Sequence, residues 1–431
     1  MTIVLPLILL GLFLAFGMPI AFALGISGSI GILLFNGWDS FLGIIQTTPY
    51  DSVKSFIMSA IPMFILMASF MTVSGIMKDL FAAAYNWLGK LPGGLAIATV
   101  FAGALMGAVS GSSQASAAAM AKAAAPEMRK YNYNTALTMG VISISGTLAV
   151  MIPPSIILIL YGILTETGVG SLLIAGIIPG IITALGYIFV IVFMVKMKPE
   201  LAPKISIELT FKEKLESLKN VWPMLLIILA VIGGIYSGFV TATEAGALGA
   251  FITLIVIILM RRINFKKFGV ALNDTIRSTT MIMTIIIGAH IFSYFLTMTQ
   301  VTQQLVLAIE GLEVSRYIIL IIIILIYLIL GFFMDQIAIL ILTLPLTFPI
   351  IISLGFDPIW FGILVAKTVE VGLVTPPVGM NIFVATGAAG VKTAEGFKGV
   401  KWFVITDLFI LLLLILLPFI TLWLPGLMMS Q

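Results

Sequence analysis

Long apolar stretches separated by short polar segments run through the whole chain. The stretches that could form continuous apolar helices lie near residues 3–16, 19–35, 55–77, 175–195, 223–240, 244–260, 278–299 and 402–424. Several of these runs approach the length needed to cross a membrane, and the alternation typical of barrel strands is absent. The composition agrees, because 61% of the 431 residues are hydrophobic and only 9% are charged. The sequence therefore predicts an all-α polytopic membrane protein.

Four further apolar stretches contain polar or proline interruptions. Two of them, near 93–125 and 317–350, read as re-entrant helical hairpins. The other two, near 134–160 and 358–389, read as helices broken by proline pairs. A proline pair leaves several backbone carbonyls without partners, and lipid tolerates such backbone only where it is buried or lines a cavity. These breaks therefore predict binding positions, with simple kinks as the alternative.

The second half of the chain repeats the order of the first. Pro153-Pro154 and Pro376-Pro377 are 223 residues apart, and the same offset places Ser110-Gly111-Ser112-Ser113 on Phe333-Met334-Asp335-Gln336. An offset of 224 places Ala21, Ala23, Leu24 and Gly25 on Ala245, Ala247, Leu248 and Gly249. Chance matching among apolar residues is the alternative, but an ordered set at nearly one offset argues against it. Two such halves are typical of secondary transporters that bind their substrate at the repeat interface.

This repeat divides the chain into two predicted units and a linker. The first repeat covers 1–205, with scaffold helices in 1–90, a hairpin and broken helix in 93–170 and a helix at 175–195. A cytoplasmic amphipathic arm follows at 206–221. The second repeat covers 222–431, with scaffold helices in 222–300, a hairpin and broken helix in 317–390 and a helix at 402–424.

The basic residues predict an orientation in the membrane. If residue 1 lies outside, the inside segments are 78–92, 122–133, 196–221, 261–277 and 391–401, and they hold 19 of the 22 Lys and Arg residues. Cytoplasmic loops of membrane proteins carry such an excess. Both termini are therefore predicted to be periplasmic, and the two halves have inverted orientations.

The hairpin tips carry the most distinctive polar residues. Ser110 to Ser113 would end a helix near the middle of the membrane and expose carbonyl and hydroxyl oxygens, which suit a hard cation such as sodium. Asp335 stands at the matching tip between strongly apolar legs. A buried carboxylate is costly there unless a cation neutralises it, so an ion site is favoured over an ion pair with Lys367. Lys367 and Glu370 could also pair with each other on one helix face.

Other candidate residues are expected to have structural roles. Glu244 lies in the first turn of a helix, where a carboxylate is favourable. His290, the only histidine, is expected to be a hydrogen-bonded core residue. The chain has no Cys, no nucleotide-binding P-loop and no catalytic constellation, so an enzyme is not predicted.

Four motifs together resemble those of the large membrane subunit of tripartite ATP-independent periplasmic (TRAP) transporters. They are Gly107 to Ser116 around the first tip, Met151-Ile152-Pro153-Pro154-Ser155, Ala242-Thr243-Glu244-Ala245-Gly246-Ala247 and Thr375-Pro376-Pro377-Val378-Gly379. The resemblance covers essentially the whole chain. It implies an elevator-type fold of the ion-transporter superfamily, in the bacterial inner membrane, that imports an organic acid with co-transported sodium. Sialic acid is favoured, and a C4-dicarboxylate comes next.

The resemblance also implies partners and site residues. The partners are a separate small four-helix membrane subunit, a periplasmic substrate-binding protein and the lipid bilayer. One sodium site would use Ser110, Gly111, Ser112, Ser113, Ser145, Gly146 and Pro153. The other would use Asp335, Thr368, Glu370, Gly372 and Thr375. Substrate would bind Ser112, Ser113, Ser116, Gln336, Pro154, Pro377 and Asn381.

Two alternative functions remain open at this point. A stand-alone sodium–dicarboxylate symporter of the same superfamily would use the same hairpins without a binding protein. A channel would use them as a gated pore and would show conductance.

Overall fold

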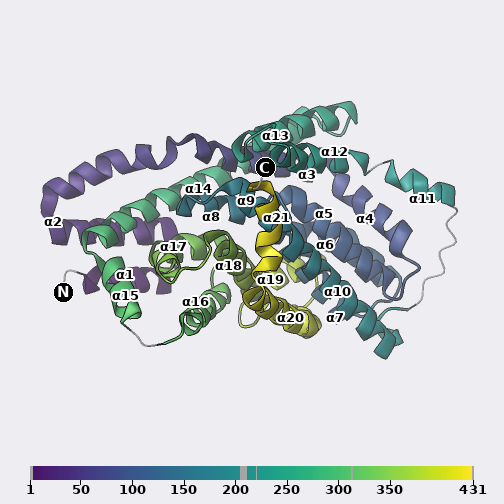
Figure 1. Cartoon of the computed structure of the whole chain (residues 1–431). Helices are drawn as coiled ribbons and strands as arrows, with labels where there is room; N and C mark the ends of the chain where they lie inside the picture. The colour runs from purple at the N-terminus through teal and green to yellow at the C-terminus, as the bar shows by residue number, and fades with distance from the viewer. Residues whose placement is uncertain (1–2, 204–210, 220, 312–313, 430–431) are drawn as a thin grey trace.

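The computed structural model describes residues 3–203, 211–219, 221–311 and 314–429, and every regular element in these ranges is a helix (Figure 1). Eight of the described helices or helix pairs are long and apolar enough to cross a membrane. A ninth is reached if the bent pair Lys212–Leu218 and Trp222–Tyr236 counts as one span. The predicted all-α polytopic membrane class is therefore confirmed.

The helices follow the predicted order. The first half contains α1 (Val4–Ala15), α2 (Ile20–Val53), η1 (Phe56–Ser59), α3 (Ala60–Ser74), α4 (Ile76–Leu88), α5 (Gly94–Ser110), α6 (Ser113–Lys130), α7 (Thr135–Met151), α8 (Ile156–Thr165), α9 (Val169–Ala175), α10 (Ile177–Met197) and η2 (Pro199–Leu201). The rest contains α11 (Phe211–Leu218), α12 (Trp222–Tyr236), α13 (Ala242–Leu259), α14 (Phe265–Met298), α15 (Val301–Glu310), α16 (Arg316–Gly331), α17 (Gln336–Ser353), α18 (Pro358–Leu373), α19 (Met380–Ala389), α20 (Thr393–Leu416) and α21 (Phe419–Met429).

Two helices are much longer than their apolar stretches. α2 continues past residue 35 to Val53 and bends at Gly37, which has a φ of 79° that glycine adopts without strain (Figure 1). α14 begins at Phe265, where the Asn264 side chain accepts from the Lys267 backbone N–H. Hydropathy missed both extensions because they mix exposed polar residues with apolar ones.

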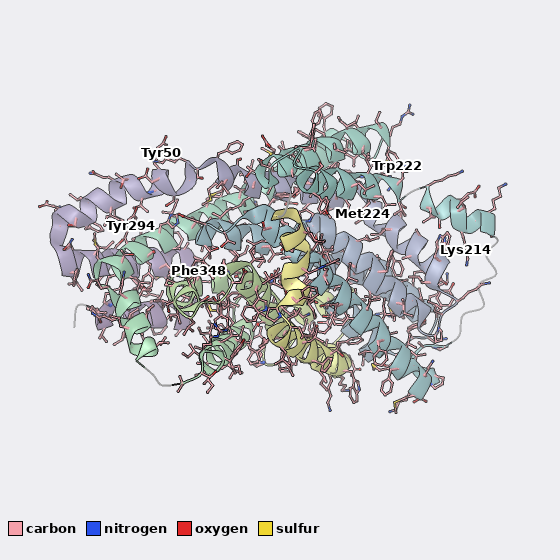
Figure 2. The ribbon with its side chains drawn as sticks, viewed as in Figure 1. Tyr50, Lys214, Trp222, Met224, Tyr294 and Phe348 are labelled. Atoms are coloured by element: carbon pink, nitrogen blue, oxygen red, sulfur yellow. The ribbon has the colours of Figure 1, made fainter. Side chains whose placement is uncertain are left out.

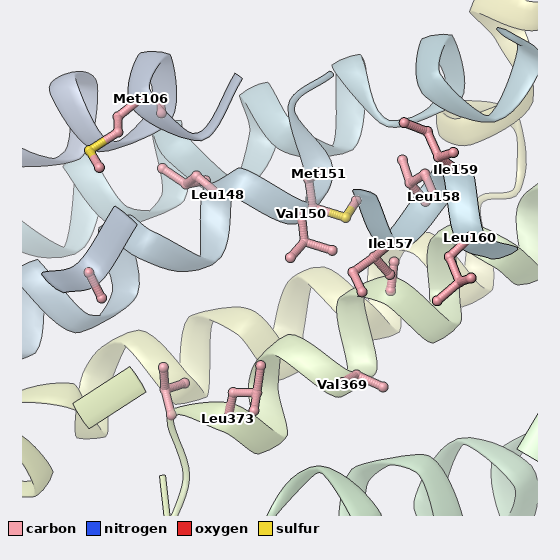
Figure 3. Close-up of a cluster of buried hydrophobic side chains, with 14 of the residues drawn as sticks. Met106, Leu148, Val150, Met151, Ile157, Leu158, Ile159, Leu160, Val369 and Leu373 are labelled. Atoms are coloured by element: carbon pink, nitrogen blue, oxygen red, sulfur yellow. The ribbon is translucent and has the colours of Figure 1, made fainter. Parts of the chain in front are cut away.

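The hairpins and breaks occur where the sequence predicts them. α5 and α6 turn at Gly111 and Ser112, and α16 and α17 turn at residues 332–335. Each proline pair separates two helices, α7 from α8 and α18 from α19. Buried side chains on both sides of the first break, including Val150 and Ile157, lie over Val369 of α18 (Figure 3). The elevator arrangement and the inverted repeat themselves stay predictions.

Glycine allows several helix pairs to approach at backbone distance. A Cβ added to Gly399 of α20 would overlap the Ala136 carbonyl oxygen of α7, and one on Gly140 would lie 2.5 Å from the Gly399 backbone. A Cβ on Gly28 of α2 would lie 2.7 Å from the Phe292 backbone of α14. Small residues at crossings are a common way to pack helices in membranes.

The outer surface is apolar, as contact with lipid requires. Tyr50, Trp222 and Tyr294 lie on the outside of the molecule with exposed rings (Figure 2). Part of the predicted arm at 206–221 lies outside the described residues. Its helix α11 packs beside α4, where the Trp87 indole N–H donates to the Lys214 carbonyl over 3.0 Å.

Gly399→Ala tests the close approach of α7 and α20. The added methyl must push the two backbones apart, so we expect a loss of about 1–3 kcal/mol of stability. Gly387→Ala is the control, because a Cβ there has no atom within 4 Å. Thermal unfolding of both variants in detergent measures the difference, and equal transition temperatures would contradict the expected overlap.

Candidate functional site

Residues from both hairpin tips line one cavity of about 590 Å³. Ser110, Gly111 and Ser112 come from the first tip, and Asp335 and Gln336 come from the second. The opposite wall comes from α3 and α14, with Ile65, Ala68, Ser69, Thr72, Asp274, Ser278, Met281 and Ile282. Serine, threonine, amide and carboxylate groups thus converge in an otherwise apolar cavity, which is the usual composition of a small-molecule site.

The two tips bond directly to each other. The Gln336 amide donates to the Ser113 hydroxyl, and that hydroxyl donates to Asn381 Oδ1 over 3.3 Å. Ser113 and Gln336 are 223 residues apart, the same separation as the two proline pairs. Matching positions that contact each other are expected where a two-fold axis passes between repeats. Gln336 Oε1 and Asn381 Nδ2 are buried and have no partner in the described structure.

The first tip is built by the end of α5 and the start of α6. Gly111 ends α5 in the left-handed region with a φ of 58°. Ser112 then caps α6 and accepts from the Ala115 N–H. Ser110 bonds Ser116 over 2.7 Å between hydroxyl oxygens. The free carbonyls at the end of α5 and these hydroxyls can bind a cation, whereas the start of α6 favours an anion.

The second tip places a carboxylate at a helix start. Asp335 is half-buried and accepts from the N–H groups of Ile337 and Ala338 over 3.0 and 3.1 Å. Both bonds go to the same carboxylate oxygen, Oδ1. The other oxygen, Oδ2, has no cap bond.

The structure brings most of the predicted first sodium site together. A Cβ on Gly146 would lie 2.5 Å from the Ser113 carbonyl oxygen, and one on Gly111 would lie 3.1 Å from the Pro154 carbonyl oxygen. The hairpin tip therefore sits against the first proline break, beside Pro153. Ser145 is turned to its own helix, because its hydroxyl donates to the Ile142 carbonyl.

The structure brings only some of the residues of the predicted second sodium site close together. Gly372 packs on Gly331 at the end of α16, which brings α18 beside the second hairpin. The Thr368 hydroxyl donates to the Leu364 carbonyl of its own helix. The Thr375 hydroxyl, just beyond the end of α18, donates back to the Val371 carbonyl of that helix. Glu370 lies near Lys367, with 3.9 Å between Oε2 and Nζ.

Only some of the predicted substrate residues line the cavity. Ser112 and Gln336 line the cavity, whereas Ser113, Ser116 and Asn381 lie behind it in the hydrogen bonds given above. Pro154 is buried and Pro377 is exposed, and neither lines the cavity.

A fully buried ion pair joins α18 to α20. Lys367 Nζ lies 2.6 Å from Asp407 Oδ1, and both side chains are completely buried. The Tyr187 hydroxyl of α10 lies 2.8 Å from both Asp407 oxygens and 3.1 Å from the Thr147 hydroxyl of α7. Lys367 therefore pairs with Asp407, and no ion pair joins it to Asp335 among the described residues. Hydropathy missed Asp407, although an acid in an apolar helix is itself a functional signal.

Asp274 is a second acid that the sequence prediction missed. It is exposed on α14 and lines the cavity. The charge pattern assigned residues 261–277 to a cytoplasmic loop, which placed Asp274 away from the predicted site.

The expectation for Glu244 is confirmed. Glu244 forms a capping box with Thr241, because its carboxylate accepts from the Thr241 N–H over 2.8 Å. The expectation for His290 is confirmed only in its hydrogen bond: Nδ1 lies 2.8 Å from the Ser52 hydroxyl, but the side chain is only partly buried and lines a cavity rather than the core.

Comparison with known proteins identifies the family. Residues 7–420 match the model of the tripartite ATP-independent periplasmic transporter, DctM component. The chain belongs to this family. It is 36% identical over 408 residues to the C4-dicarboxylate TRAP transporter large permease protein DctM of Pseudomonas aeruginosa, covering 94% of each chain. It is 28% identical to the sialic acid TRAP transporter large permease protein SiaM of Vibrio cholerae, covering 98% of this chain and 97% of that protein.

A solved structure supports the fold alone. The YdaH transporter of Alcanivorax borkumensis has a TM-score of 0.55 and 13% sequence identity, with 96% of this chain and 98% of that chain covered.

The family match identifies the protein as a TRAP large permease, a multi-pass transporter subunit and not an enzyme. Permeases of this family work with a substrate-binding protein and a small membrane subunit.

The buried ion pair predicts an order of destabilisation. Lys367→Met leaves Asp407 and Glu370 buried without a cation, and should cost about 3–5 kcal/mol. Asp407→Asn should cost less, because Lys367 keeps Glu370 nearby. Lys398→Met, which breaks an exposed pair with Glu395, is the control and should change stability little. Unfolding in detergent gives the order, and an equal loss from Lys398→Met would contradict it.

Proposed function

We propose that this TRAP permease imports a small organic acid together with sodium ions, and that both bind at the two hairpin tips. The observation that carries this proposal is the single cavity shared by Ser110, Ser112, Asp335 and Gln336. Its volume of about 590 Å³ suits a small organic acid. Its serine and threonine hydroxyls and the α6 N-terminus suit a carboxylate group.

Sodium is the proposed coupling ion because the tips offer oxygen atoms without protons. Asp335 Oδ2 has no cap bond, and Gln336 Oε1 is a buried acceptor without a partner among the described residues. The free carbonyls at the end of α5 add further oxygen ligands. The carboxylate in this apolar hairpin is far less costly when a cation neutralises it.

A C4-dicarboxylate is the first candidate substrate, and sialic acid is the second. The Pseudomonas relative whose name specifies C4-dicarboxylates is 36% identical to this chain over 408 aligned residues, compared with 28% over 423 aligned residues for the sialic acid relative. This order reverses the preference taken from the sequence alone. In the proposed complex, the small membrane subunit and the substrate-binding protein are separate chains, and the assembly lies in the bacterial inner membrane.

Proteoliposomes that contain the permease and its small subunit test the proposal. Uptake of labelled succinate or sialic acid is measured under an inward sodium gradient, with and without the binding protein. We expect uptake only when sodium and the binding protein are both present. Uptake with sodium alone would instead support a stand-alone symporter, and channel-like conductance would contradict a carrier.

Asp335→Asn tests the ion site. Asparagine also caps a helix, so the fold of the hairpin should survive while the charge is lost. We expect the sodium concentration for half-maximal uptake to rise roughly tenfold or more, equivalent to about 1.4 kcal/mol of ion binding.

Asp357→Asn is the matched control. Asp357 caps α18 through N–H bonds from Ile359 and Trp360, but it does not line the cavity. Its sodium dependence should equal that of the unmodified protein. Unchanged sodium dependence in Asp335→Asn as well would remove Asp335 from the ion site.

A further inference from the structure

A second cavity, of about 740 Å³, lies apart from the one at the hairpin tips and shares no lining residue with it. Helices α14 and α15 form one side of this second cavity, and α17 with Leu164 of α8 forms the other (Figure 1). Its residue His290 is 16 residues beyond Asp274 on α14, so the two cavities are about 24 Å apart along that helix. Leu307 at its edge is 67% exposed, so the cavity is open to the surface of the molecule.

The two sides of the second cavity differ in chemistry. The side formed by α8 and α17 is entirely apolar, with Leu164, Ile341, Leu344, Pro345, Phe348 and Pro349. The side formed by α14 and α15 carries all of the polar lining residues, which are His290, Ser293, Thr297, Thr302 and Gln303. A ligand with one polar end and a long apolar body matches both sides at once.

The polar side suits a negatively charged group. No Asp or Glu lines this cavity in the part of the chain that the structure describes, whereas Asp274 and Asp335 line the cavity at the hairpin tips. Thr302 and Gln303 belong to the first turn of α15. The free backbone N–H groups of that turn and the positive end of the helix dipole favour an anion.

His290 is placed for the same role. The Ser52 hydroxyl lies 2.8 Å from Nδ1, and Nε2 has no hydrogen bond to the described residues. When Ser52 donates to Nδ1, the neutral ring carries its proton on Nε2 and can donate a hydrogen bond to a carboxylate. The Ser293 hydroxyl, one turn farther along α14, also has no partner in the described ranges and is a second donor.

The apolar side argues against the transported acid as the occupant. A C4-dicarboxylate and sialic acid carry polar groups at both ends, and those beside Leu344 and Phe348 would be buried without hydrogen bonds. An alkyl chain is instead stabilised there by leaving water. Because α14 and α17 are both candidate membrane spans, the surrounding bilayer supplies such chains.

We propose that this second cavity binds a long-chain monocarboxylic acid that enters from the bilayer. Its carboxylate contacts His290 Nε2, the Ser293 hydroxyl and the start of α15, and its alkyl chain lies along Leu344 and Phe348 of α17. The volume of about 740 Å³ is within the usual range for one small-molecule ligand, which favours a single chain over a phospholipid with two.

The bound acid has a consequence for transport. It contacts α14 and α15 on one side and α17 on the other, and α17 is the leg of the hairpin whose tip carries Asp335. It therefore restrains this hairpin and slows uptake without occupying the substrate cavity. The slowing rests on the proposed transport function, whereas the binding does not.

Photolabelling tests the binding. The probe is hexadecanoic acid with a diazirine near the end of its chain, added to the full permease complex in phosphatidylcholine nanodiscs. We expect saturable labelling of α17 around Leu344 and Phe348, mapped by mass spectrometry and displaced by unlabelled hexadecanoic acid. Hexadecanol lacks the carboxylate and succinate lacks the chain, so each should displace the probe at least about tenfold less well.

Three variants locate the carboxylate. His290→Leu removes the imidazole donor and should weaken probe binding about tenfold, and Ser293→Ala should weaken it less. Tyr294→Leu is the matched control, because Tyr294 lies on the same helix with an exposed ring but does not line the cavity (Figure 2). Its probe binding should equal that of the unmodified protein, and unfolding transitions confirm that each variant is folded.

Three results would overturn the site. Equal labelling of His290→Leu, Ser293→Ala and the unmodified protein would indicate simple partition into the lipid. Equal displacement by hexadecanol would remove the carboxylate from the interaction. Stronger displacement by phosphatidylglycerol than by hexadecanoic acid would assign the cavity to a two-chain lipid.

Succinate uptake in proteoliposomes tests the restraint. Hexadecanoic acid should lower the maximal rate several-fold and leave the succinate concentration for half-maximal uptake unchanged, while His290→Leu should resist it. An equal loss in His290→Leu would be a general effect on the bilayer and would refute the restraint. A protein that binds the probe but transports neither succinate nor sialic acid would count against the proposed function and leave the binding site standing.

Discussion

The ion pair between Lys367 and Asp407 is the constraint on which the site depends. Both side chains are completely buried, so the loss of Lys367 would leave Asp407 as an uncompensated charge inside the protein. Tyr187 and Thr147 extend the contact to α10 and α7. Four helices are thereby fixed relative to one another, and two of them carry the proline breaks. The hairpin tips pack against these helices. The ion pair therefore helps to set the shape of the cavity, although neither of its residues lines it.

The site itself is shared equally between the halves of the chain. Ser113 and Gln336, one from each tip, are bonded to each other at the centre. Neither half can complete this contact alone, and the carbonyls, hydroxyls and carboxylate around it come from both tips. The hydrogen bond between Ser113 and Gln336 therefore joins the two tips directly, beside the cavity that both of them line.

The sequence was sufficient to predict where the helices break, because a proline pair or a polar tip within an apolar run interrupts the helical hydrogen bonds wherever it occurs. It also located Asp335 and the serines of the first tip. It did not reveal Asp407 as the partner of Lys367, since that choice depends on how α20 packs on α18. Asp274 escaped notice because the cavity wall continues along α14 beyond its apolar part. Hydropathy and charge locate elements along the chain, but side-chain partners between distant elements require the packed structure.

The glycine contacts between helices have a mechanical consequence. Where Gly140 meets Gly399, and where Gly28 meets Phe292, backbone touches backbone with no side chain between to bend or rotate. Because no side chain lies between the backbones at these crossings, we expect α7 with α20, and α2 with α14, each to move together as one unit. Met281, a flexible side chain, lines the cavity beside the hairpin tips. The positions of these glycines thus determine which pairs of helices are packed backbone to backbone and which surfaces are separated by side chains.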